Sequence, residues 1–236
     1  MRLIISPAKK MNVTPDILEC QGYPEFLEDT DKLRRYVSGL SYGEAKELWK
    51  CNDSIAEQNF ERFKDMDLQK NLTPAILAYE GIQYQYMAPS VLDAKALAYV
   101  QEHLRILSGF YGILKPLDGV VPYRLEMQAK ANVDGYKNLY AFWGKRLAET
   151  LFKETNIIIN LASKEYSKCI SAHLTPEITF ITCVFGEYVN GKIVEKGTYA
   201  KMARGEMIRF LAECQAQSPE DLKAYDRLGD AYDADA

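Results

Sequence analysis

The pattern of apolar and polar positions predicts short buried strands alternating with amphipathic helices. Continuous apolar runs predict buried strands in "RLII", which ends at Ser6-Pro7, and over residues 75–81, 156–161 and 178–185. Apolar residues at helical spacing predict helices within 24–66 and over 93–107, 139–152 and 198–214.

Local signals sharpen several of these boundaries. The sequence "SYGE" at 41–44 is typical of a capping box at a helix start. Asp93 and Thr198 are predicted to cap the N-termini of two later helices. Asn190-Gly191 lies between two β-type runs and predicts a hairpin with a type I′ turn.

These elements favour one α+β domain over residues 1–211, with a mixed or antiparallel sheet, followed by an acidic C-terminal tail over 212–236. The chain has 236 residues, 47% hydrophobic and 26% charged, with a net charge of -4. From Glu213 onward there are seven acidic residues and two basic ones, so the rest of the chain is nearly neutral. Such a tail is expected to be solvated and mobile, with shielding of a basic face as the alternative.

The cysteines and histidines, together with the apolar runs, indicate the compartment of the protein and whether it holds a metal. Five cysteines without close pairs indicate reduced thiols in a cytoplasmic protein. No apolar run approaches the ~18 residues of a membrane span, and "LIIS" is too short for a signal peptide. The two histidines stand apart from any cysteine or carboxylate cluster, so neither a metal site nor a cofactor is expected.

Candidate chemistry gathers in five short segments, two of which directly follow predicted strands. Loops at strand ends are a frequent place for functional sites. The segments are "SPAK" at 6–9, "RILSGFYGILKPLD" at 105–118, "PYRLEM" at 122–127, "NLASKEY" at 160–166 and "YAKMARGEMIRF" at 199–210. We expect one cleft to collect Lys9, Arg124, Glu126, Asn160, Lys201 and Arg204.

Two of these segments place charged side chains together. Lys201 and Arg204 are three residues apart and share a helix face beside Gly205. They form either a solvated basic face with a packing glycine or a site for close approach by an anion or another backbone. Arg124 and Glu126 project to the same side of an extended chain, as a salt bridge or as an anion clamp beside a general base.

The stretch over 107–127 combines glycines and prolines with many apolar residues. A helix ending at Leu107, then "SGFYG", then a second short helix would form a helix-hairpin-helix-like element. Its glycines, Gly109 and Gly112, would let the backbone approach a phosphate, with Arg105 and Lys115 on its flanks. A buried turn is the alternative explanation.

The segments together resemble the peroxide stress protein YaaA family of bacteria, in the family's order, from Met1 to about Leu211. The resemblance rests on "ISPAK", "HLRILSGFYGILKPLD", "PYRLEM", "LYAFWG", "INLASKEY" and "YAKMARGEMIRF". It implies a cytoplasmic protein that limits unincorporated iron during hydrogen peroxide stress and so protects DNA and proteins. It also implies an α+β cannon fold with a basic cleft and a helix-hairpin-helix that binds duplex DNA.

Carried over position by position, the resemblance implies two groups of site residues. The DNA-binding group is Arg105, Ser108, Gly109, Tyr111, Gly112, Arg124, Lys201, Arg204 and Arg209, and Lys115 joins it as a base that flanks the hairpin. The catalytic or pocket group is Ser6, Lys9, Glu126, Asn160, Ser163, Glu165 and Tyr166. Pro116, Asp118, Tyr123 and Gly205 also match the family motifs, whereas Met202 replaces a common lysine.

Two functions of different classes remain open. The first is a stress protein that binds double-stranded DNA without sequence preference through the basic cleft. The second is an enzyme on a nucleotide or nucleobase, because phosphate contacts alone do not require Glu126, Asn160, Glu165 and Tyr166. No iron-ligand cluster is visible in the sequence, so direct iron binding has the least support.

Overall fold

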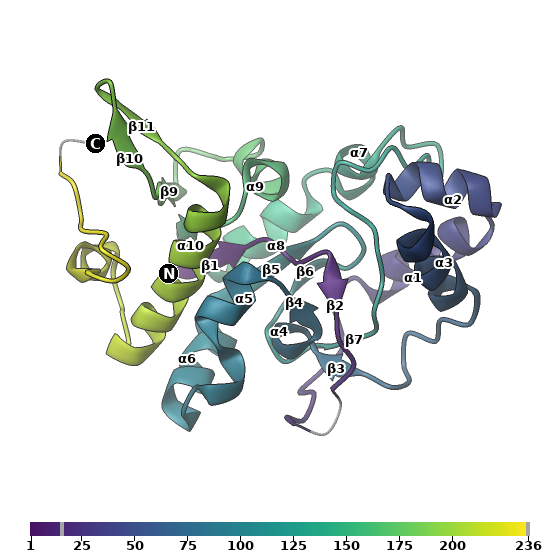
Figure 1. Cartoon of the computed structure of the whole chain (residues 1–236), viewed down its shortest axis with the longest axis horizontal. Helices are drawn as coiled ribbons and strands as arrows, with labels where there is room; N and C mark the ends of the chain where they lie inside the picture. The colour runs from purple at the N-terminus through teal and green to yellow at the C-terminus, as the bar shows by residue number, and fades with distance from the viewer. Residues whose placement is uncertain (15–16, 235–236) are drawn as a thin grey trace.

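The computed structural model describes residues 1–14 and 17–234 and contains a mixed five-stranded sheet (Figure 1). Its strand order is β6-β5-β1-β8-β9. Strands β5, β1, β8 and β9 run parallel, and β6 pairs antiparallel with β5. The five strands are β1 (Arg2–Ile5), β5 (Leu104–Ser108), β6 (Gly112–Leu114), β8 (Ile157–Asn160) and β9 (Thr179–Thr182).

The predicted strand "RLII" is confirmed as β1 and lies at the centre of this sheet. Leu3, Ile4 and Ile5 have no exposed surface, because strands flank β1 on both edges and helices contact the sheet. The runs at 156–161 and 178–185 are confirmed as β8 and β9. The chain is therefore a single α+β domain with a mixed sheet, as the sequence predicts.

Helices surround the sheet in groups. Helices α5, α6 and α10 pack together, and α8 packs against α9. Helices α1, α2 and α3 cluster at the end of the molecule away from the hairpin of β10 (Glu187–Val189) and β11 (Lys192–Val194) (Figure 1). The helices are α1 (Leu27–Ser38), α2 (Tyr42–Trp49), α3 (Asp53–Lys64), α4 (Ala75–Ala78), α5 (Ile82–Met87), α6 (Ala94–His103), α7 (Leu139–Trp143), α8 (Arg146–Glu154), α9 (Lys164–Ser171) and α10 (Gly197–Cys214). The 3-10 helices are η1 (Pro89–Val91) and η2 (Pro219–Ala224).

Smaller strand pairs complete the fold. They are β2 (Lys10–Met11) with β4 (Tyr79–Glu80), β3 (Thr73–Pro74) with β7 (Gly119–Val120), and β10 (Glu187–Val189) with β11 (Lys192–Val194). The type I′ turn between β10 and β11 is confirmed, since Asn190 and Gly191 have φ of 51° and 74°.

Most capping predictions hold. Ser41 and Glu44 form the capping box of α2, and Asp93 accepts a hydrogen bond from the Ala96 backbone N–H at 2.7 Å. The prediction for Thr198 is wrong, because α10 begins at Gly197 and no side chain caps it. The helix predicted over 139–152 is divided into α7 and α8 at Gly144, which has φ of 53°.

Two other elements differ from the sequence-based prediction. Residues 75–81 form the short helix α4 followed by the two-residue strand β4, because a short apolar run does not distinguish the two structures. The helix predicted over 93–107 ends at His103, and the chain continues as β5. The element predicted to resemble a helix-hairpin-helix is therefore a hairpin of strands, β5 and β6, whose side chains are all buried.

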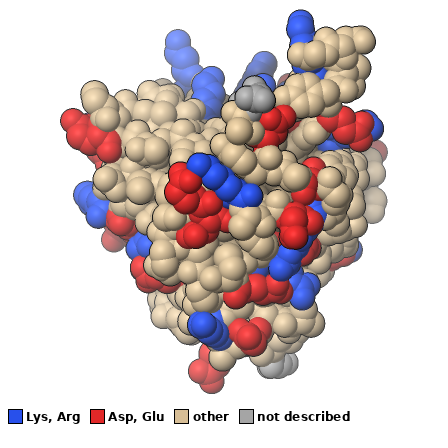
Figure 2. Space-filling view, turned by 90° about the vertical axis from the view of Figure 1, so that its left-hand side faces the viewer, with Lys and Arg blue, Asp and Glu red and all other residues tan. Residues whose placement is uncertain are grey.

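The C-terminal acidic tail contacts the body of the protein. Tyr225 is 4% exposed and packs its ring against Phe185 and Phe210. Arg227 forms ion pairs with Glu206 and Glu213 of α10. This part of the tail is therefore packed against α10, contrary to the solvated tail expected, and acidic and basic side chains intermix on the face where it lies (Figure 2).

Two further observations bear on the class of protein. All five cysteines are free thiols. None of the helices within residues 1–14 and 17–234 is long and apolar enough to cross a membrane.

Candidate functional site

A cleft of about 550 Å³ lies where the parallel strands β1 and β8 end. Its walls come from the loop after β1, the segment over 122–127, the start of α9, the start of α5 and the first half of α10. The lining residues are Ser6, Pro7, Ala8, Lys9, Lys10, Glu80, Gly81, Ile82, Gln83, Tyr84, Tyr123, Arg124, Leu125, Glu126, Ser163, Glu165, Tyr166, Lys201 and Arg204.

The predicted convergence is confirmed for five of the six side chains. The cleft collects Lys9, Arg124, Glu126, Lys201 and Arg204. Asn160 does not line it, and is 4% exposed at the end of β8. Its Oδ1 accepts a hydrogen bond from the Ala162 backbone N–H at 2.9 Å, and its Nδ2 donates to Thr182 at 3.2 Å. Asn160 therefore shapes the loop that leads into α9.

Two serines join this loop to the loop after β1. Ser6 Oγ accepts a hydrogen bond from the Ser163 backbone N–H at 2.9 Å and donates to Ser163 Oγ at 3.2 Å. Tyr84 of α5 donates to the Ser6 backbone oxygen at 3.0 Å. Because these bonds connect three elements distant in sequence, they fix the floor of the cleft.

A shared ion pair forms one wall. Glu126 accepts from Arg124 at 3.1 Å through one carboxylate oxygen and lies 2.9 Å from Lys9 Nζ through the other. The Arg124 side chain is 10% exposed, whereas that of Lys9 is 65% exposed. The salt bridge predicted from "PYRLEM" is thus present, and it lies inside the cleft with an exposed cation at its rim.

Glu165 and Tyr166 lie at the start of α9. Burial raises the pKa of Glu165, and the negative charge of Glu126 adds to the effect, opposed by the Gln128 backbone N–H that donates to Glu165 at 3.2 Å. Burial also raises the pKa of Tyr166 well above its usual value. Tyr166 is therefore a hydrogen-bond donor at neutral pH, and Glu165 takes up a proton more readily than an exposed glutamate.

Helix α10 supplies two cations to the opposite wall. Arg204 pairs with Glu195 at 3.0 Å and its side chain is 15% exposed, whereas Lys201 is exposed. Gly205 lies against the backbone of α5, where a β-carbon would collide with the backbone oxygen of Gln83. The close approach predicted at Gly205 is therefore made by another backbone, which brings Gln83 and Arg204 to the same cleft.

Three buried N–H groups of cleft residues have no hydrogen-bond partner in the part of the chain that is described. They are Arg124 Nε, Arg204 Nε and Gln83 Nε2. Buried donors in native proteins are nearly always paired, so three in one cleft require an explanation. Five cations and three carboxylates line the same cleft. The arrangement therefore favours a ligand that carries negative charge and hydrogen-bond acceptors.

The glycine-containing stretch at the β5–β6 turn packs behind the segment over 122–127, which forms one wall of the cleft. Ser108 Oγ accepts from the backbone N–H groups of Phe110 and Tyr111 and lies 2.6 Å from the Tyr123 hydroxyl. At Gly109, a β-carbon would lie 2.5 Å from the backbone oxygen of Leu125. Gly109 and Ser108 thus let the segment over 122–127 pass close behind the β5–β6 turn, which places Arg124 and Glu126.

The other residues of the predicted DNA-binding group lie elsewhere. Ser108, Tyr111, Gly109 and Gly112 are buried, and Tyr111 accepts a hydrogen bond from the Val121 backbone N–H. Gly112 has φ of 77°, which favours glycine at this turn. These positions hold the buried turn, which was the alternative explanation of the motif.

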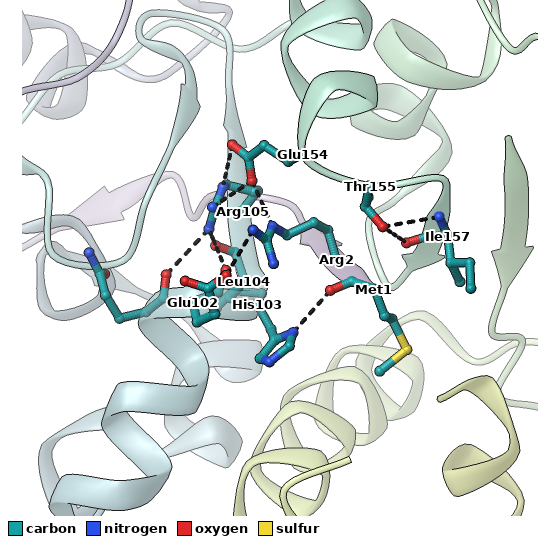
Figure 3. Close-up of polar contacts among 10 residues, drawn as sticks. Met1, Arg2, Glu102, His103, Leu104, Arg105, Glu154, Thr155 and Ile157 are labelled. Atoms are coloured by element: carbon teal, nitrogen blue, oxygen red, sulfur yellow. Dashed lines mark hydrogen bonds and ion pairs between the residues drawn. The ribbon is translucent and has the colours of Figure 1, made fainter. Parts of the chain in front are cut away.

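Arg105 is 4% exposed and lies outside the cleft, where it converges with Arg2 on Glu154 (Figure 3). Its Nε and Nη2 donate to Glu154 at 3.2 and 2.6 Å, and its Nη1 donates to three backbone oxygens. Burial raises the pKa of Glu154, but the two guanidiniums outweigh it and hold the pKa below its usual value.

The remaining predicted cations, Lys115 and Arg209, do not line the cleft either. Lys115 is exposed beside a second hollow of about 330 Å³ that also contains Arg105 and Asp118. Arg209 pairs with Glu213 one turn further along α10.

Sequence reasoning missed several cleft residues. Lys10, Glu80, Gln83 and Tyr84 come from β2, β4 and α5, where no motif was recognised. Lys10 and Glu80 meet only because β2 pairs with β4, which are 70 residues apart. The one local signal of the cleft in this part of the sequence was the glycine at position 81. Its lack of a β-carbon leaves room for Ala8, because a β-carbon there would lie 3.2 Å from that of Ala8.

The chain is similar in sequence to known proteins along its whole length. A family model described as "Peroxide stress protein YaaA" matches residues 1–236. A protein of Lachnoclostridium phytofermentans named "UPF0246 protein" is 58% identical over 233 residues, which cover 99% of this chain and 91% of the relative. Another of that name, from Agathobacter rectalis, is 55% identical over 235 residues, which cover 100% and 94%.

Proposed function

The chain belongs to the peroxide stress protein YaaA family, and on that premise we propose that its cleft binds a phosphate-bearing, nucleotide-like ligand and acts on it. The observation that carries this proposal is the set of buried, unpartnered donors on Arg124, Arg204 and Gln83. Guanidinium groups match phosphate oxygens in geometry as well as charge. The cleft volume of about 550 Å³ lies within the range of small-molecule sites.

The cleft also offers groups for acid–base chemistry. Glu165, with its raised pKa, would exchange a proton with the ligand, and the protonated Tyr166 would orient the ligand by donating a hydrogen bond. Glu126 would hold Lys9 and Arg124 in position until the ligand arrives. Binding of a phosphate alone would not require Glu126, Glu165 and Tyr166.

Calorimetric titration with AMP, CMP, GMP and UMP tests the binding. Replacing Arg124 or Arg204 by methionine should weaken the affinity for the bound nucleotide about 10- to 100-fold, because each variant removes a charge-assisted hydrogen bond. Arg209→Met is the matched control, since Arg209 lies on α10 outside the cleft. Equal affinities in all three variants and the unaltered protein would refute the phosphate site.

Peroxide survival of a deletion strain that carries each variant tests the chemistry. If the cleft acts on its ligand, Glu165→Gln should abolish protection while nucleotide or DNA affinity stays equal or rises, because a negative charge has been removed. If protection follows affinity in every variant, the catalytic role is wrong and binding alone accounts for the function.

Binding of duplex DNA is the second candidate, and the exposed rim of the cleft favours it. Lys9 and Lys10 are 65% and 71% exposed, and Lys201 is exposed beside them. Phosphate neutralisation makes affinity fall steeply with salt and carries no sequence preference. Lys201→Gln should flatten the salt slope, whereas Arg105→Ala should leave it unchanged because Arg105 is buried. A flattened slope with Arg105→Ala or Lys115→Ala would instead favour the β5–β6 region as the DNA contact.

The physiological output we propose is a lower level of unincorporated iron in the cytoplasm during hydrogen peroxide stress. In residues 1–14 and 17–234 no group of three or more His, Cys, Asp or Glu is placed to hold a metal ion. We therefore propose an indirect route, through the ligand of the cleft. Measuring chelatable iron in cells that carry Arg204→Met or Arg209→Met tests this link, since only the cleft variant should raise it.

A further inference from the structure

A smaller hollow of about 200 Å³ adjoins the cleft and has no role in the function proposed above. It lies between the C-terminal end of α2 and the chain that follows the "PYRLEM" segment. Its lining residues are Lys9, Leu48, Trp49, Lys50, Arg124, Glu126, Gln128 and Ala129.

The hollow and the cleft share one wall. Lys9, Arg124 and Glu126 line both, so the two spaces adjoin at the ion-pair cluster that these three residues form. Sites for whole small molecules usually measure about 300–1,000 Å³, a range that includes the cleft and excludes the hollow. The hollow is therefore suited to one part of a ligand whose other part lies in the cleft.

Trp49 provides an independent sign of a ligand here. Its side chain is 3% exposed, and its indole Nε1–H has no hydrogen-bond partner within the described residues. Trp143, in contrast, donates its Nε1–H to the Gly109 backbone oxygen at 3.0 Å. A buried indole N–H normally has such a partner, so Trp49 lacks an acceptor that a ligand can supply.

The polar groups of the hollow include both hydrogen-bond donors and hydrogen-bond acceptors. Trp49 offers a donor, Lys50 offers a cation at an exposed position directly after α2, and Glu126 offers carboxylate oxygens as acceptors. A phosphate carries acceptors, which match Trp49 and Lys50, but no donor for the Glu126 carboxylate. The edge of a nucleobase carries donors and acceptors side by side in a flat ring, which matches this set.

We propose that the small hollow is a nucleobase compartment, which holds the base of a nucleotide while its phosphate binds Arg124 and Arg204 in the cleft. This inference rests on the proposed function, because it requires the phosphate to bind in the cleft. The Trp49 indole N–H donates to an acceptor atom on the base edge. The Lys9–Glu126 ion pair lines both compartments, and the sugar would lie against it.

Binding of AMP, CMP, GMP and UMP, compared with ribose 5-phosphate, tests the compartment. The unaltered protein should bind at least one nucleotide more tightly than ribose 5-phosphate, which lacks a base. Trp49→Phe keeps an aromatic ring and removes the donor, so it should weaken that nucleotide about 3- to 10-fold and leave ribose 5-phosphate unchanged. Tyr99→Phe is the matched control, because it removes a buried unpartnered donor that lies outside both spaces.

A second measurement needs no variant. The chain has two tryptophans, so its indole N–H resonances are readily resolved by NMR. Titration with the tightest nucleotide should shift the Trp49 resonance and leave that of Trp143 in place, whereas ribose 5-phosphate should shift neither.

The outcomes separate this inference from the function on which it rests. If ribose 5-phosphate binds and no nucleotide binds more tightly, the compartment is wrong while the phosphate site stands. If Trp49→Phe weakens both kinds of ligand equally, or the Trp49 resonance does not move, the compartment is also wrong. If neither kind of ligand binds, the phosphate site and the compartment are both wrong.

Discussion

Arg105 in the β5–β6 region and Arg124 in the cleft are arginines with little exposed side chain, 5% and 10%, that the sequence assigned to the same task. The guanidinium of Arg105 is fully used, since Nε, Nη1 and Nη2 all donate to Glu154 or to backbone oxygens. Arg124 donates to Glu126 and leaves its Nε without a partner among the described residues, as Arg204 does beside Glu195.

The difference separates an arginine that stabilises the fold from one that is prepared for a ligand. A satisfied guanidinium gains nothing by meeting a phosphate, because it must first break bonds to Glu154. An incompletely satisfied one gains the missing hydrogen bond as well as the charge interaction. Burial and charge are similar at the two arginines, so the hydrogen bonds that each makes distinguish them.

The largest effect that the comparison predicts is on stability at Arg105. Arg105→Met should lower the free energy of unfolding by about 3 kcal/mol, because Glu154 keeps only Arg2 as a partner in a partly buried position. Urea denaturation measures this change. Nucleotide affinity of the folded variant should be unaltered, and Arg209→Met should change stability by less than about 0.5 kcal/mol because its pair is surface-exposed. A loss of nucleotide affinity at unchanged stability would reverse the comparison.

A smaller effect is expected where the two regions touch. Gly109→Ala should lower the free energy of unfolding by about 2 kcal/mol, because its β-carbon would lie 2.5 Å from the Leu125 backbone oxygen. It should also weaken nucleotide binding, since the displaced segment carries Arg124 and Glu126. Gly43→Ala in α2 is the control. Nothing lies within 4 Å of the added carbon there, so a gain of about 0.5–1 kcal/mol is expected. Normal nucleotide affinity in Gly109→Ala would show that the β5–β6 turn does not position the cleft.

The smallest effect concerns Asp118, in the hollow beside Arg105. Burial raises the pKa of Asp118 to about 6, against the hydrogen bond from the Lys115 backbone N–H. Because the folded state holds this proton more tightly than the unfolded state, the carboxyl lowers stability progressively as pH rises from about 4 to about 6. Asp118→Asn should therefore be roughly 1–2 kcal/mol more stable than the unaltered protein at pH 7.5 and equally stable near pH 3.5. Denaturation curves at the two pH values measure the difference, and a difference that does not depend on pH would contradict this assignment.

The parts of the fold that follow local rules could be predicted from the sequence. The Asn190-Gly191 turn, the Asp93 cap and the apolar run in β1 all depend on neighbours within a few residues. The end of α6 could not be predicted in this way. Leu104 and the residues after it are equally compatible with a helix, and pairing with β1, about a hundred positions earlier, makes them a strand.

In the candidate site, too, some residues could be predicted from the sequence and others depend on partners far along the chain. Lys9 and Glu165 could be predicted to meet because they follow β1 and β8, and loops at the ends of parallel strands meet at one edge of a sheet. Arg124, Glu126, Lys201 and Arg204 do not follow parallel strands, and only the polar residues of their segments grouped them with this edge. Arg105 was assigned to the DNA-binding group and is buried instead, and this burial could not be predicted because its partner Glu154 is 49 positions away and no local pattern connects them. Gln83 and Trp49 carry no signal in the sequence, since what marks them is a missing hydrogen bond in the folded chain.

The central claim, that the cleft arginines are prepared for a phosphate and Arg105 is not, can be tested most directly by NMR of the arginine Nε–H groups. Arg105→Lys, Arg124→Lys and Arg204→Lys variants would assign the three resonances, and the tightest-binding nucleoside monophosphate would then be titrated into the unaltered protein. We predict that the Nε–H resonances of Arg124 and Arg204 shift on binding, while that of Arg105 stays in place. A shift of Arg105, or no shift of either cleft arginine at saturating nucleotide, would contradict the account.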